Sequence, residues 1–206
     1  MLVEVKHLSK FFGTKLVFRN LGFSAGRGEI VLVLGSNGSG KSTLLRILAG
    51  LLHPSSGSAS VSTGPGEIGY MGHQTCVYPG WSAWENISFW SKLYRRSWDK
   101  EGMEEILKRL GLHRTRHELV TSFSRGMTQR LNLARVLTID PWLYLLDEPS
   151  TGLDMASQEV LHEKMLELRD KGRTLVWVSH QPEADRAYAD KVLHLQGKSG
   201  WMETTA

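Results

Sequence analysis

The sequence predicts an α/β domain built around a mostly parallel β-sheet. Three apolar segments, at residues 29–34, 142–146 and 174–178, are short and almost unbroken, as expected of strands that are buried on both faces. A glycine-rich loop follows the first segment, and a stretch of helical spacing at residues 154–171 separates the other two. This order of strand, helix and strand favours parallel strands joined by right-handed crossovers.

The N-terminal part of the chain predicts a second, antiparallel sheet. Short apolar segments at residues 2–5, 15–18 and 21–23 are separated by turns. Residues 53–58 have turn composition, and a further strand of the same sheet is expected at residues 59–62. We expect these strands to pair with one another and to lead into the first buried strand.

The middle of the chain predicts an inserted helical unit. Residues 83–135 show mostly helical spacing, for example over residues 103–110 before Gly111. The pattern of buried strands then returns, and residues 192–195 are expected to form the last strand. We therefore expect one domain over residues 1–206. Residues 1–75 carry the antiparallel sheet and the glycine-rich loop, residues 76–135 the helices, and residues 136–206 the rest of the core.

The glycine-rich loop matches the phosphate-binding pattern G-x-x-x-x-G-K-[ST], and a helical pattern over residues 44–50 follows it, which is the context that the pattern requires. Glycines let successive backbone N–H groups turn toward an anion, and the helix N-terminus adds a partial positive charge. Lys41 is expected to reach the outer phosphates and Ser42 to bind Mg²⁺. Kinases, GTPases and many ATPases share this loop. Its predicted nucleotide-binding residues are Gly35, Ser36, Asn37, Gly38, Ser39, Gly40, Lys41, Ser42 and Thr43.

Acidic and imidazole side chains follow two of the predicted buried strands. Asp147 ends the strand at residues 142–146, where a carboxylate beside the phosphate loop is placed to hold Mg²⁺. The adjacent Glu148 is free to orient or deprotonate a water molecule. His180 follows the strand at residues 174–178 and could hydrogen-bond a γ-phosphate, although a single histidine at a strand end is more often structural.

The segment FSRGMTQRL at residues 123–131 leads into a helix and, together with the other motifs, resembles the ATP-binding cassette (ABC) ATPases. Their signature loop reads roughly LSGGQ and opens a helix shortly before the acidic strand. The resemblance covers nearly the whole chain, with the motifs in the family's order. They are the phosphate loop at residues 35–43, a glutamine loop at Gln74, the signature at residues 123–127, the acidic strand at residues 142–148, a D-loop at residues 150–154 and a switch histidine at His180.

This resemblance implies a P-loop NTPase fold, with a RecA-like parallel-sheet core, an N-terminal antiparallel β subdomain and an inserted helical subdomain. It implies ATP as the nucleotide and Mg²⁺ held by Ser42, Asp147 and Gln74. Glu148 then serves hydrolysis, His180 senses the γ-phosphate, and Gln74 links Mg²⁺ or water to a partner. Phe12, or its neighbour Phe11, resembles the position that stacks on adenine.

The signature implies a second cassette, expected to be another copy of this chain. In this family Ser124 and Gly126 face the γ-phosphate bound by the opposite subunit, so that two cassettes close on two ATP molecules. Two residues depart from the family pattern: Arg125 replaces a glycine and Met127 replaces a glutamine. The glutamine's contact with nucleotide is therefore not implied here, and Arg125 is expected to point to solvent.

Composition and length limit the kinds of ABC protein that the chain can be. No apolar segment is long enough to cross a bilayer, so a transporter needs separate integral membrane subunits. The N-terminus lacks the apolar segment of a signal peptide, and the single cysteine suits the cytosol, so we expect a peripheral protein on the cytoplasmic face of the inner membrane. A net charge of +4 is too small to indicate nucleic acid. Ribosomal or DNA-repair ABC proteins usually carry two cassettes or long coiled-coil insertions, which 206 residues do not accommodate.

Two short motifs resemble one particular subgroup of the ABC ATPases. GHQ at residues 72–74 and SHQP at residues 179–182 resemble the ATP-binding subunit of the haem-exporter-like complex of bacterial cytochrome c maturation, which implies a periplasmic haem chaperone as an indirect partner. The form of the signature segment resembles that of general ABC-2-type export ATPases equally well, so a general export ATPase remains the alternative. His73 and Cys76 are candidate haem ligands, but Cys76 is expected to pack near the glutamine loop, and haem binding by this chain is not expected.

The start of the helical unit is rich in aromatic residues. In this family that section receives the coupling helices of membrane subunits, and aromatic side chains favour interfaces. Packing inside a small helical unit is the alternative. The residues are Tyr78, Trp81, Trp84, Phe89, Trp90, Tyr94 and Trp98.

Overall fold

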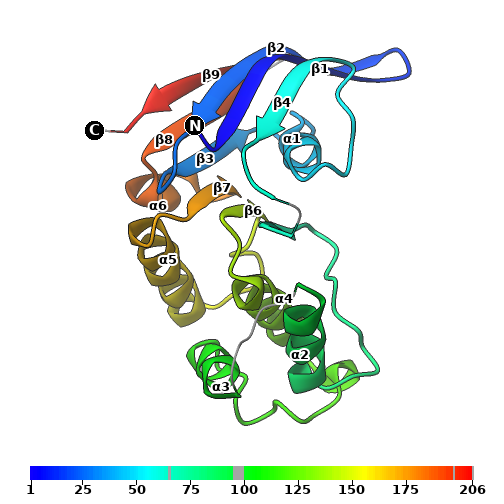
Figure 1. The fold of residues 1–206 in the computed structure, drawn as a ribbon, viewed down its shortest axis with the longest axis vertical. Helices are drawn as coiled ribbons and strands as arrows, with labels where there is room; N and C mark the ends of the chain where they lie inside the picture. Colours follow the sequence, from blue (N-terminus) through cyan, green and yellow to red (C-terminus); the bar gives the residue numbers. More distant parts are fainter. Residues whose placement is uncertain (65, 95–99, 197, 206) are drawn as a thin grey trace.

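The structure is a computed structural model that describes residues 1–64, 66–94, 100–196 and 198–205. Trp98 lies outside the described residues. None of the helices in the described ranges combines the length and the apolar character that a membrane span needs. Figure 1 shows the strands gathered at one end of the molecule, and helices α2 (Ala83–Leu93) and α3 (Lys100–Arg109) at the other.

The strands of the described chain form two sheets. In the antiparallel sheet, β1 (Val3–Phe12) lies between β2 (Lys15–Ala25) and β4 (Ser56–Val61). The larger sheet has the order β5-β6-β7-β3-β8-β9, and all of its pairs are parallel except the pair β8 and β9. Its strands are β3 (Ile30–Gly35), β5 (Ile68–Met71), β6 (Leu143–Asp147), β7 (Thr174–Val178), β8 (Lys191–Gln196) and β9 (Ser199–Thr204).

The central strands of the larger sheet are buried on both faces, as their unbroken apolar composition predicts. On one face, Leu32 and Trp177 pack in a core with residues of α2, α3, α4 and α5. On the other face, Val33 and Val178 pack against α1 and the antiparallel sheet. Side chains alternate between faces along a strand, so each central strand contributes to both cores. The remaining helices are α1 (Lys41–Leu48), α4 (Arg125–Ile139), α5 (Met155–Asp170) and α6 (Pro182–Asp185), with 3₁₀ turns at Val120–Ser122 and Arg186–Tyr188.

Two expectations for the strands are wrong. Residues 15–18 and 21–23 belong to one strand, β2, because the chain continues through Asn20 with a left-handed φ of 54° and an irregular register instead of turning back. Residues 192–195 are not the last strand, because β9 follows them in an antiparallel hairpin. β9 is an edge strand without a fully buried residue, so its sequence lacks the apolar pattern that indicates the inner strands.

A charged cluster joins α3 to α5 and gives a pH-dependent contribution to stability. Hydrogen bonds from Lys171, then Lys164 and Arg109, lower the pKa of Glu167 from 4.5 to about 2. Because the folded pKa is the lower one, the stabilisation is present above the unfolded value and is lost as the pH falls toward 2. We expect Glu167→Gln to cost at most about 1 kcal/mol at neutral pH, since the group is partly solvated. Urea unfolding at several pH values measures this, and a cost that stays constant down to pH 2 would contradict the assignment.

Candidate active site

The phosphate loop connects the end of β3 to the start of α1. Gly40 precedes the helix with a φ of 102°, and a Cβ there would lie 2.6 Å from Cγ1 of Val17 and 2.8 Å from Cδ1 of Phe18. Only glycine fits this left-handed position under the antiparallel sheet. The Lys41 ammonium donates to the carbonyl oxygens of Gly35 at 2.7 Å and Ser36 at 3.1 Å, so the side chain turns back toward its own loop.

A cavity of about 500 Å³ opens over this loop and contains most of the predicted ATP-binding residues. Phe12 stands at its edge with 52% of its surface exposed, while Phe11 does not line the cavity. Glu148 and His180 face the loop from the ends of neighbouring strands, as parallel strands require. The loop residues that line it are Asn37, Gly38, Gly40, Lys41, Ser42 and Thr43.

Asp147 offers a carboxylate suited to a divalent cation. The residue is 2% exposed, and neither carboxylate oxygen has a hydrogen-bond partner of normal length among the described residues. Burial raises the pKa of Asp147 above its ordinary value, and the nearby Ser42 hydroxyl and His73 oppose that rise. A buried carboxylate that accepts no hydrogen bond of normal length, next to a loop hydroxyl, fits Mg²⁺, which prefers oxygen ligands.

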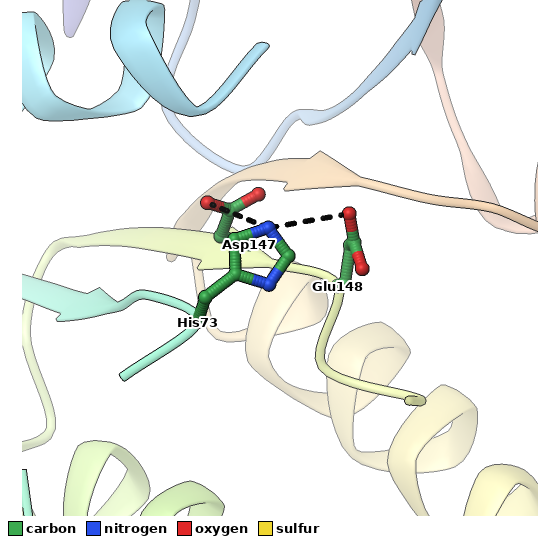
Figure 2. Close-up of side chains that lie close together, drawn as sticks. All are labelled: His73, Asp147 and Glu148. Carbon is green, nitrogen blue, oxygen red and sulfur yellow. Dashed lines mark ion pairs between the residues drawn. The ribbon is translucent and has the colours of Figure 1, made fainter. Parts of the chain in front are cut away.

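Glu148 lies between two imidazole rings. Its Oε1 is 2.5 Å from Nε2 of His180 and 3.4 Å from Nε2 of His73. Figure 2 shows His73 pointing toward Glu148 and also toward Asp147, whose Oδ2 is 3.9 Å from Nε2. The Thr151 hydroxyl donates to Oε2 of Glu148 at 3.4 Å. Glu148 has a φ of 57°, an unfavourable conformation that its backbone N–H stabilises by donating to Val178 at 3.0 Å.

The structure brings His73, and not Gln74, to the carboxylates. Gln74 is exposed and lines neither this cavity nor the second one described below. The sequence indicates His73 only as a candidate haem ligand, because a histidine in a loop has no pattern that predicts where its ring points. The adjacent Cys76 is exposed and does not pack as expected, although its carbonyl accepts a hydrogen bond from Trp90 at 3.1 Å.

The signature segment begins α4 outside the cavity over the phosphate loop. Ser124 is exposed and caps the helix by accepting a hydrogen bond from the N–H of Met127 at 3.2 Å. Neither Ser124 nor Gly126 lines the cavity over the phosphate loop. A Cβ on Gly126 would lie 2.9 Å from the carbonyl oxygen of Gly152, so the signature and the D-loop approach closely. No residue of either motif lines the cavity over the chain's own phosphate loop.

The two departures from the family signature occupy different surroundings. Arg125 is exposed and lines a second cavity of about 360 Å³ that also contains Asp147, Glu148 and Thr151. Met127 is half-buried and packs against the helical core. The side chain at position 127 thus contributes to packing, and the cation at position 125 lines a cavity that also contains the acidic pair.

The phosphate loop, the acidic pair at the end of β6 and the signature segment at the start of α4 together define a class of nucleotide-binding domain. Residues 18–151 match the protein family described as ABC transporter, and the chain belongs to this family of ATP-hydrolysing domains. The fold class expected from the sequence is confirmed.

Several curated relatives resemble the chain. The cytochrome c biogenesis ATP-binding export protein CcmA of Paramagnetospirillum magneticum is 37% identical, over 91% of this chain and 94% of the relative. The ABC transporter ATP-binding protein NatA of Bacillus subtilis is 36% identical, over 85% and 76%. The Fe(3+) ions import ATP-binding protein FbpC of Haemophilus influenzae is 32% identical over 95% of this chain, and the chain spans 60% of that relative's length.

Solved structures share the fold over nearly the whole chain. The ATP-binding subunit of an ABC transporter superposes with a TM-score of 0.89 at 27% identity, over 99% of this chain and 90% of that one. A dimeric post-hydrolysis state of the cassette MJ0796, bound to ADP and Pi, has a TM-score of 0.85 at 25% identity, over 98% of both chains.

The buried Asp147 carboxylate is expected to affect stability and nucleotide binding in opposite directions. We expect Asp147→Asn to raise the thermal unfolding midpoint of the nucleotide-free protein by a few degrees, because a buried carboxylate that accepts no hydrogen bond of normal length costs about 1–3 kcal/mol. With MgATP the order should reverse, because a ligand stabilises the form that binds it. Calorimetric scans with and without MgATP measure both effects. An Asp147→Asn variant that MgATP stabilises as much as wild type would contradict the cation role of Asp147.

Proposed function

We propose that the chain is the ATP-hydrolysing subunit of an export complex, in which two copies close on two ATP molecules. The observation that supports this proposal is that the site is divided between two places: the signature residues do not line the cavity over the phosphate loop. The loop, Glu148 and His180 line one cavity and Asp147 lies beside the loop residue Ser42, while Ser124 and Gly126 do not line that cavity. A second copy supplies the missing signature, and the dimeric MJ0796 cassette supports that arrangement.

In the proposed reaction the oxygen of a water molecule bonds to the γ-phosphorus. The water proton passes to the Glu148 carboxylate, and the bond between the γ-phosphorus and the bridging oxygen of the β-phosphate breaks. Lys41 leaves its loop carbonyls to neutralise the outer phosphates, and His180 holds Glu148 or the γ-phosphate in place. Ser42 and Asp147 would hold Mg²⁺, which would supply neutralisation of charge on the phosphates. Gln74 joins this site only if its loop moves.

The proposed membrane partners are separate integral membrane subunits on whose cytoplasmic side the chain is peripheral. An exposed aromatic cluster at the start of the helical unit supports this. The ring of Trp81 lies 4.5 Å from that of Tyr78 and 5.4 Å from that of Phe89, and Tyr78 and Trp81 are 41% and 37% exposed. Trp84 instead packs against the helical core. Exposed, mutually packed aromatic rings are typical of interface anchors.

The process that the chain serves is proposed to be cytochrome c maturation, where hydrolysis drives haem export or the release of a periplasmic haem chaperone. The motifs GHQ and SHQP support this assignment, as do relatives named CcmA at 37%, 37% and 33% identity. A general ABC-2-type export ATPase is the second candidate, favoured by the form of the signature and by NatA at 36% identity.

Cells that carry Glu148→Gln are expected to lack mature c-type cytochromes. A complex that cannot hydrolyse ATP should stop after its partner proteins have attached haem to the chaperone and before the haem is passed on. Haem should still attach to the periplasmic chaperone and remain there, while b-type cytochromes stay normal because haem synthesis is upstream. Haem staining of membrane and periplasmic fractions after gel separation tests this. Normal c-type cytochromes, in a host without a second copy of the system, would favour the general export ATPase and leave the catalytic assignments unchanged.

A further inference from the structure

A buried chain of hydrogen bonds ties the turn that carries His180 to helix α5. Nε2 of His162, on α5, lies 2.9 Å from Oδ1 of Asp185 and donates to it, because an ionised carboxylate only accepts. The other oxygen of Asp185 accepts from the Ser179 hydroxyl. The Ser179 oxygen in turn accepts from the backbone N–H of Gln181 at 2.8 Å. The two residues that flank His180 are thus held by one chain of bonds that begins on α5.

This chain is shielded from solvent and fixed in place. His162, Asp185 and Ser179 are 8%, 1% and 4% exposed. The His162 ring stacks on Tyr188, with centroids 4.2 Å apart, and contacts Trp177 of β7 at 5.5 Å. Buried polar groups are costly unless they are satisfied, and a satisfied network is rigid. The turn therefore has a defined position relative to α5 and β7.

The other end of the network reaches the catalytic carboxylate. Nε2 of His180 lies 2.5 Å from Oε1 of Glu148, so a shift of the turn displaces the ring that contacts Glu148. Helix α5 starts at the D-loop, where Asp154 caps it by accepting from the N–H of Ser157 at 2.8 Å. The network thus connects the helix that follows the D-loop with the residue that faces the hydrolytic centre.

We propose that His162 and Asp185 are positioning residues that fix the turn carrying His180 and thereby set the rate of hydrolysis without changing the affinity for ATP. The inference rests on the role proposed above for His180. Neither residue belongs to the phosphate loop, the signature or the acidic pair, and neither lines the cavity over the loop.

The first test is His162→Phe, which keeps an aromatic ring against Tyr188 but removes the donor to Asp185. We expect kcat for ATP hydrolysis to fall about tenfold or more, because small displacements of catalytic groups cost that much, and KM for ATP to stay within about twofold. His162→Gln, which retains an N–H donor of similar reach, should recover most of kcat. A loss in which KM rises and kcat is unchanged would overturn the proposal.

A second variant separates positioning from folding. His162→Phe with Asp185→Leu removes both buried partners, which relieves much of the stability lost when one partner stays alone. We expect its thermal midpoint to lie above that of His162→Phe, while kcat remains low because Ser179 has lost its acceptor. A double variant with restored stability and wild-type kcat would show that the pair serves stability alone.

A mutant cycle identifies the residue through which the network acts. In a His180→Ala background, His162→Phe should lower kcat no further, because the ring that the network positions is gone. An undiminished effect of His162→Phe in that background would overturn the proposal. Wild-type turnover in His180→Ala alone would contradict the role proposed for His180 itself, and the two failures are therefore distinguishable.

Discussion

Glu148→Gln is expected to lower kcat for ATP hydrolysis by about a hundredfold or more while leaving the Kd for ATP nearly unchanged. The amide keeps the size of the side chain but does not accept the proton of the attacking water. Binding is expected to survive because the proposed contacts with the phosphates come from the loop and from Lys41, and not from Glu148. The contacts with His180 and His73 weaken, since an amide attracts an imidazole less than a carboxylate does.

Steady-state turnover and equilibrium binding of a fluorescent ATP analogue measure the two quantities separately. Glu159→Gln is a matched control, because it makes the same change on α5, away from the cavity. Turnover within about threefold of wild type in Glu148→Gln would remove Glu148 from the proton-accepting role.

Ser124→Arg is expected to lower kcat by about a hundredfold although the side chain lies outside the chain's own ATP cavity. In the proposed dimer the serine hydroxyl and the start of α4 face the nucleotide of the other copy, and a long cation there keeps the two surfaces apart. The affinity of the isolated subunit for ATP should change little, because the loop side of the site is untouched.

The matched control is Ser122→Arg, which places the same bulk and charge on an exposed residue two positions earlier. It should retain most of the activity. Equal losses in both variants would indicate a general effect of charge on this segment, and a loss of ATP affinity in Ser124→Arg would place the serine in the site of its own subunit. Either result would contradict the proposed division of the site.

The sequence predicted those parts of the fold that depend on residues close together in the chain. The unbroken apolar strands at β3, β6 and β7 and the glycine pattern of the loop each follow from neighbouring residues. β5 escaped prediction because it is a four-residue edge strand interrupted by Gly69, and it is held by pairing with β6, which is distant in sequence.

The candidate site could be predicted to the level of motifs but not of side-chain contacts. The convergence of Lys41, Asp147, Glu148 and His180 follows from the rule that parallel strands end at one edge of the sheet. The approach of His73 to the carboxylates depends on the path of an irregular loop, which no periodicity encodes. The bond between His162 and Asp185 likewise joins residues on separate elements, so only the folded chain reveals it.

ATP is proposed to join two copies of this chain through the signature surface. Sedimentation velocity of purified Glu148→Gln, with and without ATP, measures this most directly because the variant binds ATP without consuming it. A monomer that becomes a dimer on addition of ATP, and that remains a monomer when Ser124→Arg is added, is the result expected from mass action. The same sedimentation coefficient with and without ATP, or a dimer that persists in the Ser124→Arg variant, would show that ATP does not join two copies through the signature surface.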